Sequence, residues 1–129
     1  MPADAYFEWH TEGKTKTPYA VSSDTGLLAF AGVYSWWRES PASEWVLTAT
    51  ILTMAAPEPI AWLHDRTPVV LAAEDWDWWL NREMAANPAF VADAVSRAIP
   101  VASVLQAHEV NPVRGDGPEL LLPAAHGRL

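Results

Sequence analysis

The N-terminal half of the chain alternates between short apolar runs and polar segments, which is typical of β-strands joined by turns. Residues 5–9 and 18–22 are predicted strands, and the polar, glycine-containing segment 10–17 between them is predicted to be a turn. Two longer runs rich in β-branched and aromatic residues, 27–37 and 44–54, predict a hairpin of long strands. The second run is apolar or small on both alternating faces, so we expect a central strand buried on both sides.

The C-terminal half mixes strand and helix patterns. Residues 67–71 predict a strand that starts with the extended backbone favoured before proline. Residues 74–81 predict a helix, because three acidic residues lie in its first turn and Trp76, Trp79 and Leu80 share one face. Asn87 and Pro88 suit the N-cap and first position of a second helix, whose apolar stripe consists of Val91, Ala94, Val95 and Ala98.

The remaining chain, residues 100–110, is predicted to return to strand, and a turn at 115–117 leads to a last short strand. Strands, then two or three short helices, then strands again predict an α+β fold with a mainly antiparallel, barrel-like sheet. A chain of 129 residues and 14.2 kDa forms one ordinary domain, which at this mass buries about two-thirds of its unfolded surface.

The net charge and the cysteine content argue against several classes of binding and catalytic function. The formal net charge is −8, from 8 basic and 16 acidic residues, which argues against strong, general adhesion to nucleic acid but leaves room for a local basic site. There is no cysteine, which excludes a disulfide scaffold, a cysteine-ligated zinc site and a thiol nucleophile within this chain.

Targeting and membrane signals are also missing. The first ten residues carry no basic region of the kind that opens a secretory signal, and the two longest uncharged stretches have 13 residues each, whereas a membrane-spanning helix needs about 20. We therefore expect no membrane partner and a cytoplasmic location, associated with the nucleoid when DNA is bound.

Familiar catalytic signatures are absent from the sequence, including the glycine-rich phosphate loops and the zinc-protease helix motif. The four histidines lack short ligand spacings, so we expect neither a metal site nor a cofactor. Three candidate regions remain: Glu8 between two aromatic residues, the tripeptide HDR at 64–66, and the turn from Asn111 to Arg114.

Each candidate region also has a purely structural interpretation. Glu8 could lie on the solvent face of an edge strand, alternating with buried Phe7 and Trp9. His64 could be a hydrogen-bonded loop histidine, and Asp65 and Arg66 could form a weak surface ion pair. The eight tryptophans could serve mainly in packing.

Taken together, these segments resemble the SOS response-associated peptidase (SRAP) family, whose members are also called abasic-site processing proteins. The resemblance covers residues 2–123, in the order PADAYFEW, KTPYAV, LLAFAGVYSWW, TATILTMAA, LHDRTPVVL, EDWDWWL and VNPVRGDGPELL. It implies a protein of the DNA damage and SOS response that binds single-stranded DNA and senses abasic sites. It further implies that a cysteine at the mature N-terminus closes a thiazolidine cross-link with the aldehyde of the lesion and also clips the protein's own N-terminus.

The same resemblance assigns roles to seven residues. Glu8 is implied in acid–base assistance to sugar-ring opening, and His64 in proton transfer during cross-link formation or reversal. The implied DNA-binding residues are Trp9, which stacks near the lesion, Arg66, which contacts phosphate, Thr53, which hydrogen-bonds substrate, and the less defined Asn111 and Arg114.

The sequence departs from the family in its opening. Family members begin Met-Cys-Gly and carry an Asn-Ala-Arg segment and further arginines before the PAD motif, whereas this chain starts at Met1-Pro2. We therefore expect an N-terminally truncated SRAP domain. Pro2 as a replacement amine is a weak alternative, since six residues of strand place it about 20 Å from Glu8.

Three functional hypotheses follow. The first is an SRAP enzyme that has lost its N-terminal portion. The second is a pseudoenzyme that binds single-stranded DNA without cross-linking, and the third is a protein-interaction domain that uses exposed tryptophan. In each case uncovered strand edges predict a poorly soluble chain or a homo-oligomer.

Overall fold

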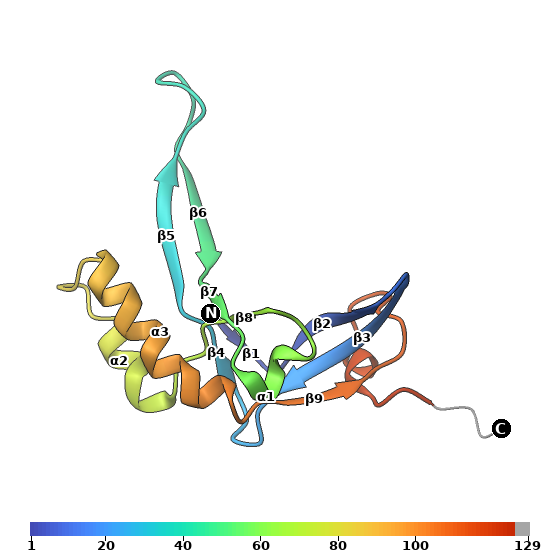
Figure 1. Ribbon diagram of the computed structural model, residues 1–129. Helices are drawn as coiled ribbons and strands as arrows, with labels where there is room; N and C mark the ends of the chain where they lie inside the picture. The colour runs from blue at the N-terminus through green and yellow to red at the C-terminus, as the bar shows by residue number, and fades with distance from the viewer. Residues whose placement is uncertain (126–129) are drawn as a thin grey trace.

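The computed structural model describes residues 1–125, and its elements alternate short strands with three α-helices (Figure 1). In chain order they are β1 (Pro2–Ala3), β2 (Tyr6–Glu12), β3 (Thr15–Ser22), β4 (Leu28–Ala29), β5 (Gly32–Trp37), β6 (Val46–Ile51), β7 (Thr53–Ala55), α1 (Glu58–Ala61), β8 (Arg66–Pro68), the 3-10 turn η1 (Ala73–Asp75), α2 (Trp76–Trp79), α3 (Pro88–Ala102), β9 (Gln106–Glu109) and the 3-10 turn η2 (Pro118–Leu121).

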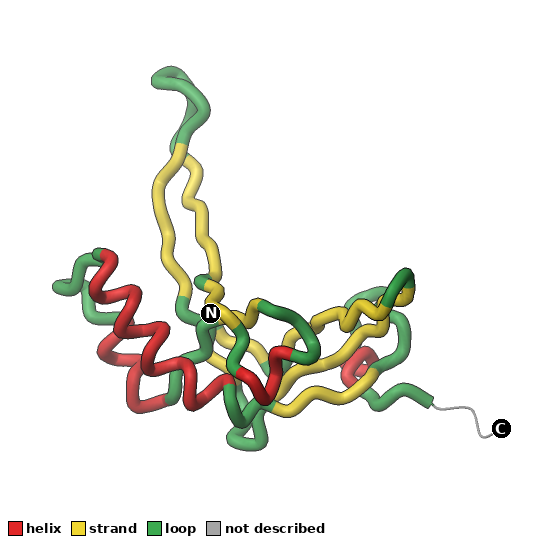
Figure 2. The backbone as a smooth tube through the Cα atoms, viewed as in Figure 1, coloured by secondary structure: helices red, strands yellow, loops and turns green. Residues whose placement is uncertain are grey.

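All strand pairs are antiparallel, which confirms the α+β class with mainly antiparallel sheets. Within residues 1–125 the strands form four small sheets, ordered β2-β3-β9, β1-β4, β5-β6 and β7-β8, and these do not close into a barrel. None of the helices in this range is long and apolar enough to cross a membrane. Figure 2 shows the helices gathered mostly at one end and the three-stranded sheet at the other.

The hairpin β2–β3 is longer than the sequence pattern predicts. The segment 10–17 is mostly strand, so its assignment as a turn was wrong: Glu12 pairs with Thr15, and only Gly13 and Lys14 connect the strands. Gly13 has a φ of 59°, a conformation that costs glycine little and that two-residue hairpin turns require. The longer hairpin extends β2 beyond Glu8.

Helix α3 is also longer than the sequence pattern predicts. Asn87 caps it as expected, since its side chain accepts a hydrogen bond from the Phe90 N–H at 2.9 Å. The helix continues through Pro100 to Ala102, so the strand predicted from residue 100 was wrong and starts only at Gln106. The buried stripe explains the extension, because Ala94, Ala98 and Ala102 recur every fourth residue and are each fully buried.

Two other sequence-based assignments differ from the structure. The short helix α1 was not predicted, and the final strand expected after the turn at 115–117 is instead the 3-10 turn η2, followed by a single bridge between Val110 and Pro123. The helix predicted at 74–81 is confirmed as η1 continued by α2.

The hairpin β5–β6 stands away from the rest of the molecule (Figure 1). The expectation that residues 44–54 form a doubly buried central strand was wrong, since most of β6 is exposed and Leu47 retains 54% of its surface. Across from it in the register, Trp36 is 59% exposed. Alternation alone could not reveal that this hairpin lacks a packing layer within the described residues.

A small core cluster positions the segment that contains His64. Val21 of β3 packs with Ile60 and Leu63, and Tyr6 and Tyr19 border them. These contacts hold helix α1 and the loop after it against one face of the β2–β3 hairpin.

Candidate functional site

Strand β2 presents alternate residues to the segment between α1 and β8. Tyr6, Glu8 and His10 share one face of the strand because side chains alternate with a period of two. The Tyr6 hydroxyl shares a hydrogen bond with the Thr67 hydroxyl at 3.1 Å, and the His10 ring lies 5.6 Å from the ring of Trp62. Glu8 is thus held between two fixed contacts.

Glu8 and His64 line the same pocket, although they lie far apart in the sequence. The pocket has a volume of about 440 Å³, and its lining residues are Glu8, Trp9, Thr11, Lys16 and His64. Glu8 and Trp9 point to opposite faces of β2, so a pocket lined by both wraps the edge of that strand. In the described part of the chain, β2 pairs only with β3, which leaves this edge open.

The Glu8 carboxylate binds the backbone at the open edge. Its Oε1 accepts a hydrogen bond from the Trp9 N–H at 3.0 Å. Trp9 lies opposite Pro18, which has no N–H to donate across the pair. Among the hydrogen bonds of residues 1–125, Oε2 has no protein partner, so it is available to a bound molecule. Trp9 is 41% exposed while Glu8 is partly buried, the reverse of the purely structural interpretation.

His64 is oriented by contacts with Asp65 and Arg66. Its Nδ1 accepts the Arg66 N–H at 3.1 Å and also lies 3.1 Å from Oδ1 of Asp65. A neutral ring can accept from Arg66 with its proton on Nε2, whereas a doubly protonated ring donates from Nδ1 to Asp65. In both states Nε2–H remains available as a hydrogen-bond donor.

Arg66 and Thr53 form a unit rather than two separate sites. Nη2 of Arg66 donates to both the carbonyl and the hydroxyl oxygen of Thr53, each at 2.8 Å, across the β7–β8 pair. The rest of the exposed guanidinium is left for an anion.

Asn111 and Arg114 lie elsewhere. Both are exposed on the loop after β9. This loop borders a separate pocket on the other side of β2, to which Phe7, Val113 and Asp116 contribute. The structure therefore does not bring these two residues to the pocket that contains Glu8.

The environment of Tyr6 perturbs its ionisation. Burial raises the pKa of the phenol above its ordinary value of 10.0, and the nearby Glu8 charge raises it further, while the hydrogen bond with Thr67 opposes the shift. Tyr6 therefore stays neutral at physiological pH and acts as a structural link between β2 and β8.

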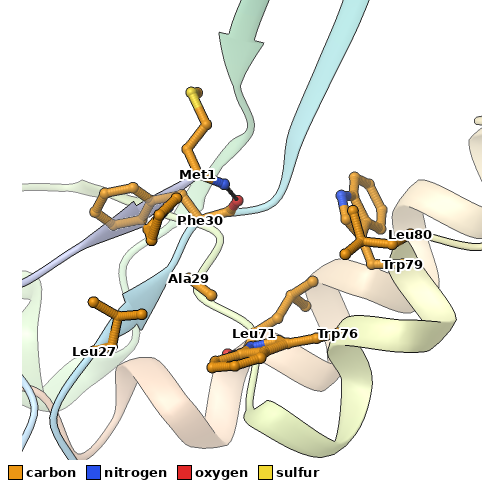
Figure 3. A pocket seen from close by; sticks show the side chains of 9 residues that line it. Met1, Leu27, Ala29, Phe30, Leu71, Trp76, Trp79 and Leu80 are labelled. Carbon is orange, nitrogen blue, oxygen red and sulfur yellow. Dashed lines mark hydrogen bonds between the residues drawn. The ribbon is translucent and has the colours of Figure 1, made fainter.

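A second pocket, of about 190 Å³, is apolar (Figure 3). Leu27, Leu71, Trp76 and Trp79 line it, and at its margin the N-terminal ammonium donates to the Phe30 carbonyl at 2.8 Å. Pro2 lines this pocket and not the one that contains Glu8. The structure thus separates Pro2 from Glu8 and His64, as the strand spacing predicts.

Residues 1–125 contain no cluster of three or more histidine, aspartate or glutamate side chains that could hold a metal ion. His108 is engaged with the Leu121 carbonyl at 2.8 Å, and His126 lies outside the described residues.

Sequence reasoning missed Thr11 and Lys16, which line the pocket with Glu8, and Trp62, whose ring contacts Tyr19 and His10. The first two were assigned to a turn, although their strand positions could have been predicted from the Gly13 turn and the alternation on either side of it. The placement of Trp62 depends on how α1 packs, which no local pattern reveals.

Comparison with known proteins identifies similar chains. The abasic site processing protein YMR114C of Saccharomyces cerevisiae is 43% identical over 79 residues, covering 59% of this chain and 20% of the relative. The abasic site processing protein HMCES of Gallus gallus is 30% identical over 148 residues, covering 97% and 43%. The abasic site processing protein YedK of Escherichia coli is 30% identical over 128 residues, covering 94% and 55%.

Two crystal structures have a similar fold. A protein from Bacteroides thetaiotaomicron superposes with a TM-score of 0.77 at 23% identity, covering 96% of this chain and 55% of the other. A protein from Bordetella bronchiseptica gives a TM-score of 0.67 at 25% identity, covering 87% and 54%. The chain thus spans about half the length of the solved structures and no more than 55% of these curated relatives. The family model for SOS response associated peptidase (SRAP) matches residues 1–114, so the chain belongs to this family.

Proposed function

We propose that this chain binds single-stranded DNA at abasic sites and carries the proton-transfer residues of an abasic-site processing centre. The observation that carries the proposal is the pocket at the edge of β2, which brings Glu8 and His64 together. The names of the relatives support the substrate, since those proteins are abasic site processing proteins.

The two groups suit the opening of an abasic sugar. In the closed form of that sugar, C1′ carries a hydroxyl and is bonded to the ring oxygen. Oε2 of Glu8 takes the hydroxyl proton while protonated His64 gives a proton to the ring oxygen, the C1′–O bond breaks and an aldehyde forms. Protons and bonds balance without any other reactant.

DNA contacts come from groups near the pocket. The guanidinium of Arg66, fixed by Thr53, and the ammonium of Lys16 supply local positive charge in an acidic chain, and the exposed indole of Trp9 can stack on a base. The pocket volume lies in the range of small-molecule sites, which leaves room for a sugar that has lost its base.

The covalent step requires a group that this chain does not contain. The resemblance to the family implies a cysteine nucleophile, and the sequence has no cysteine. We therefore propose non-covalent recognition and ring opening by this chain, with cross-linking and self-cleavage dependent on a cysteine supplied from outside it.

Binding of fluorescent oligonucleotides tests the proposal. We expect this chain to bind a single strand with one abasic site more tightly than the intact strand or the duplex, with an affinity that falls as salt rises. Arg66→Ala should weaken binding about 5- to 30-fold, as for loss of one charge-assisted contact of about 1–2 kcal/mol, and should flatten the salt dependence.

Arg82→Ala is the matched control, because Arg82 is also exposed but borders a different pocket with Tyr34 and Met84. Equal effects of the two substitutions, or no binding by the unsubstituted chain, would overturn the proposal. A heat-stable covalent product would contradict the requirement for a cysteine.

Self-association is a second proposal, supported by a different observation. The accessible surface is 9178 Å², whereas a compact monomer of this mass exposes about 6,800 Å². The hairpin β5–β6 exposes several large apolar side chains, among them Trp36, Trp37 and Leu47, and two-stranded hairpins are marginal by themselves in water. We propose that copies of this chain associate through that hairpin.

A further inference from the structure

Trp62 is an exposed indole held in a fixed position. It lies directly after α1 and retains 49% of its surface. Its ring makes an edge contact with Tyr19, with centroids 5.1 Å apart and planes at 82°, and lies 5.6 Å from the ring of His10. Two aromatic rings from different strands thus immobilise one part of the indole and leave the rest open.

The two residues that contact this indole flank Glu8 in the β2–β3 hairpin. Tyr19 is the cross-strand partner of Glu8, and His10 follows Glu8 on the same face of β2. Both residues that contact Trp62 are therefore immediate neighbours of the Glu8 carboxylate. His64, which lines the pocket, is only two residues from Trp62 along the chain.

Packing alone accounts poorly for this arrangement. A tryptophan that serves the core is largely buried, whereas Trp62 leaves half its surface in water, two residues before the pocket-lining His64. Glu8 has a second exposed indole as its chain neighbour, since Trp9 is 41% exposed. A sugar placed at Glu8 thus has an open aromatic surface in two directions.

We propose that Trp62, supported by His10 and Tyr19, is a stacking platform for a nucleobase adjacent to the abasic site. This inference rests on the proposed function, because it takes the pocket at Glu8 to hold the lesion. Stacking on an aromatic face tolerates any base, so the platform orders the strand without reading its sequence. Trp9 and Trp62 then hold the flanking nucleotides apart at the position where the base is missing.

Oligonucleotides lacking selected bases test the platform. The probe is a single strand with a tetrahydrofuran abasic analogue, either with all other bases or with the base on its 5′ or 3′ side also omitted. We expect Trp62→Ala to weaken binding of the first strand by roughly 5- to 150-fold, which corresponds to the 1–3 kcal/mol of a stacked base. The loss should disappear for one of the strands with a second omission, because the base that stacks is then absent.

Controls separate the possible outcomes. Trp62→Phe should retain much of the affinity, and Leu80→Ala, at an exposed apolar position outside the β5–β6 hairpin, should leave it unchanged. If Trp62→Ala weakens all strands equally, or weakens none while Arg66→Ala still does, the platform is wrong but the proposed function stands. If the unsubstituted chain binds none of the strands, both are wrong. Thermal unfolding of each variant identifies a loss of affinity that reflects only a loss of structure, and such a result also counts against the platform.

Discussion

At the scale of single residues, the Tyr6 hydroxyl connects the strand of Glu8 to the strand of Arg66. Its partner, the Thr67 hydroxyl, belongs to a residue with only 2% exposure, so Thr67 has no ready access to water when the Tyr6 hydroxyl is removed. A buried pair of this kind fixes the distance between β2 and β8, and with it the separation of the two sides of the pocket.

We predict that Tyr6→Phe lowers the free energy of unfolding by about 1 kcal/mol at neutral pH, because Thr67 loses its partner. The folded-state pKa of Tyr6 is raised, so the unfolded chain ionises first as pH passes 10.0, and the contribution of the neutral phenol to stability is lost above that pH. The two stability curves should therefore converge above pH 10 in urea titrations. Tyr34→Phe, at a 75% exposed position, should change neither the free energy of unfolding nor its dependence on pH. Parallel stability curves for Tyr6→Phe and the unsubstituted chain would contradict the prediction.

At the scale of elements, α3 combines local and tertiary stabilisation. Its N-terminus follows a local rule, with Asn87 capping Phe90 and Pro88 in the first turn. Its C-terminal turn contains Pro100, which is unfavourable inside a helix because proline lacks the N–H that would bond within it. Burial of Ala98 and Ala102 on either side of that proline outweighs the missing hydrogen bond.

We predict that Asn87→Ala destabilises the protein by about 1 kcal/mol, since the Phe90 N–H loses its acceptor at the helix start. Asn87→Asp should keep most of that stability because a carboxylate also caps. Chemical denaturation followed by circular dichroism measures both. Equal losses for the two substitutions would show that the cap contributes little.

At the scale of the whole molecule, the β5–β6 hairpin exposes a group of large apolar side chains on one element. Val46, Leu47, Trp36 and Trp37 each retain more than half of their surface. Within the described residues, contacts with the core occur at the base of the hairpin, where Ile51 borders a core cluster and Trp79 Nε1 donates to the Gly32 carbonyl. Such a surface favours association over isolation in water.

We predict that the chain sediments as a dimer or larger species at micromolar concentration. Replacing the cross-strand pair Trp36 and Leu47 with threonine should shift it toward the monomer, because threonine suits a strand but removes the apolar surface. As a control, Leu80 and Val104, which lie outside the hairpin and are 71% and 68% exposed, are replaced with threonine, and the sedimentation of the chain should not change. A concentration-independent monomer in sedimentation velocity would contradict the proposed association.

The sequence by itself determined what depends on neighbouring residues: the α+β class, the Asn87 cap, the strands around the FEW and HDR motifs, and the absence of a thiol nucleophile. Family motifs also pointed to Glu8, His64 and Arg66 as site candidates. Only the tertiary structure decided that Glu8 and His64 share a pocket, that Thr53 holds Arg66, and that Asn111 and Arg114 lie elsewhere. It also reversed the expected burial of residues 44–54 and revealed that Trp62 contacts Tyr19 and His10. The reason is physical: alternation and capping are set within a few residues, whereas burial and side-chain proximity depend on which elements pack together across the chain.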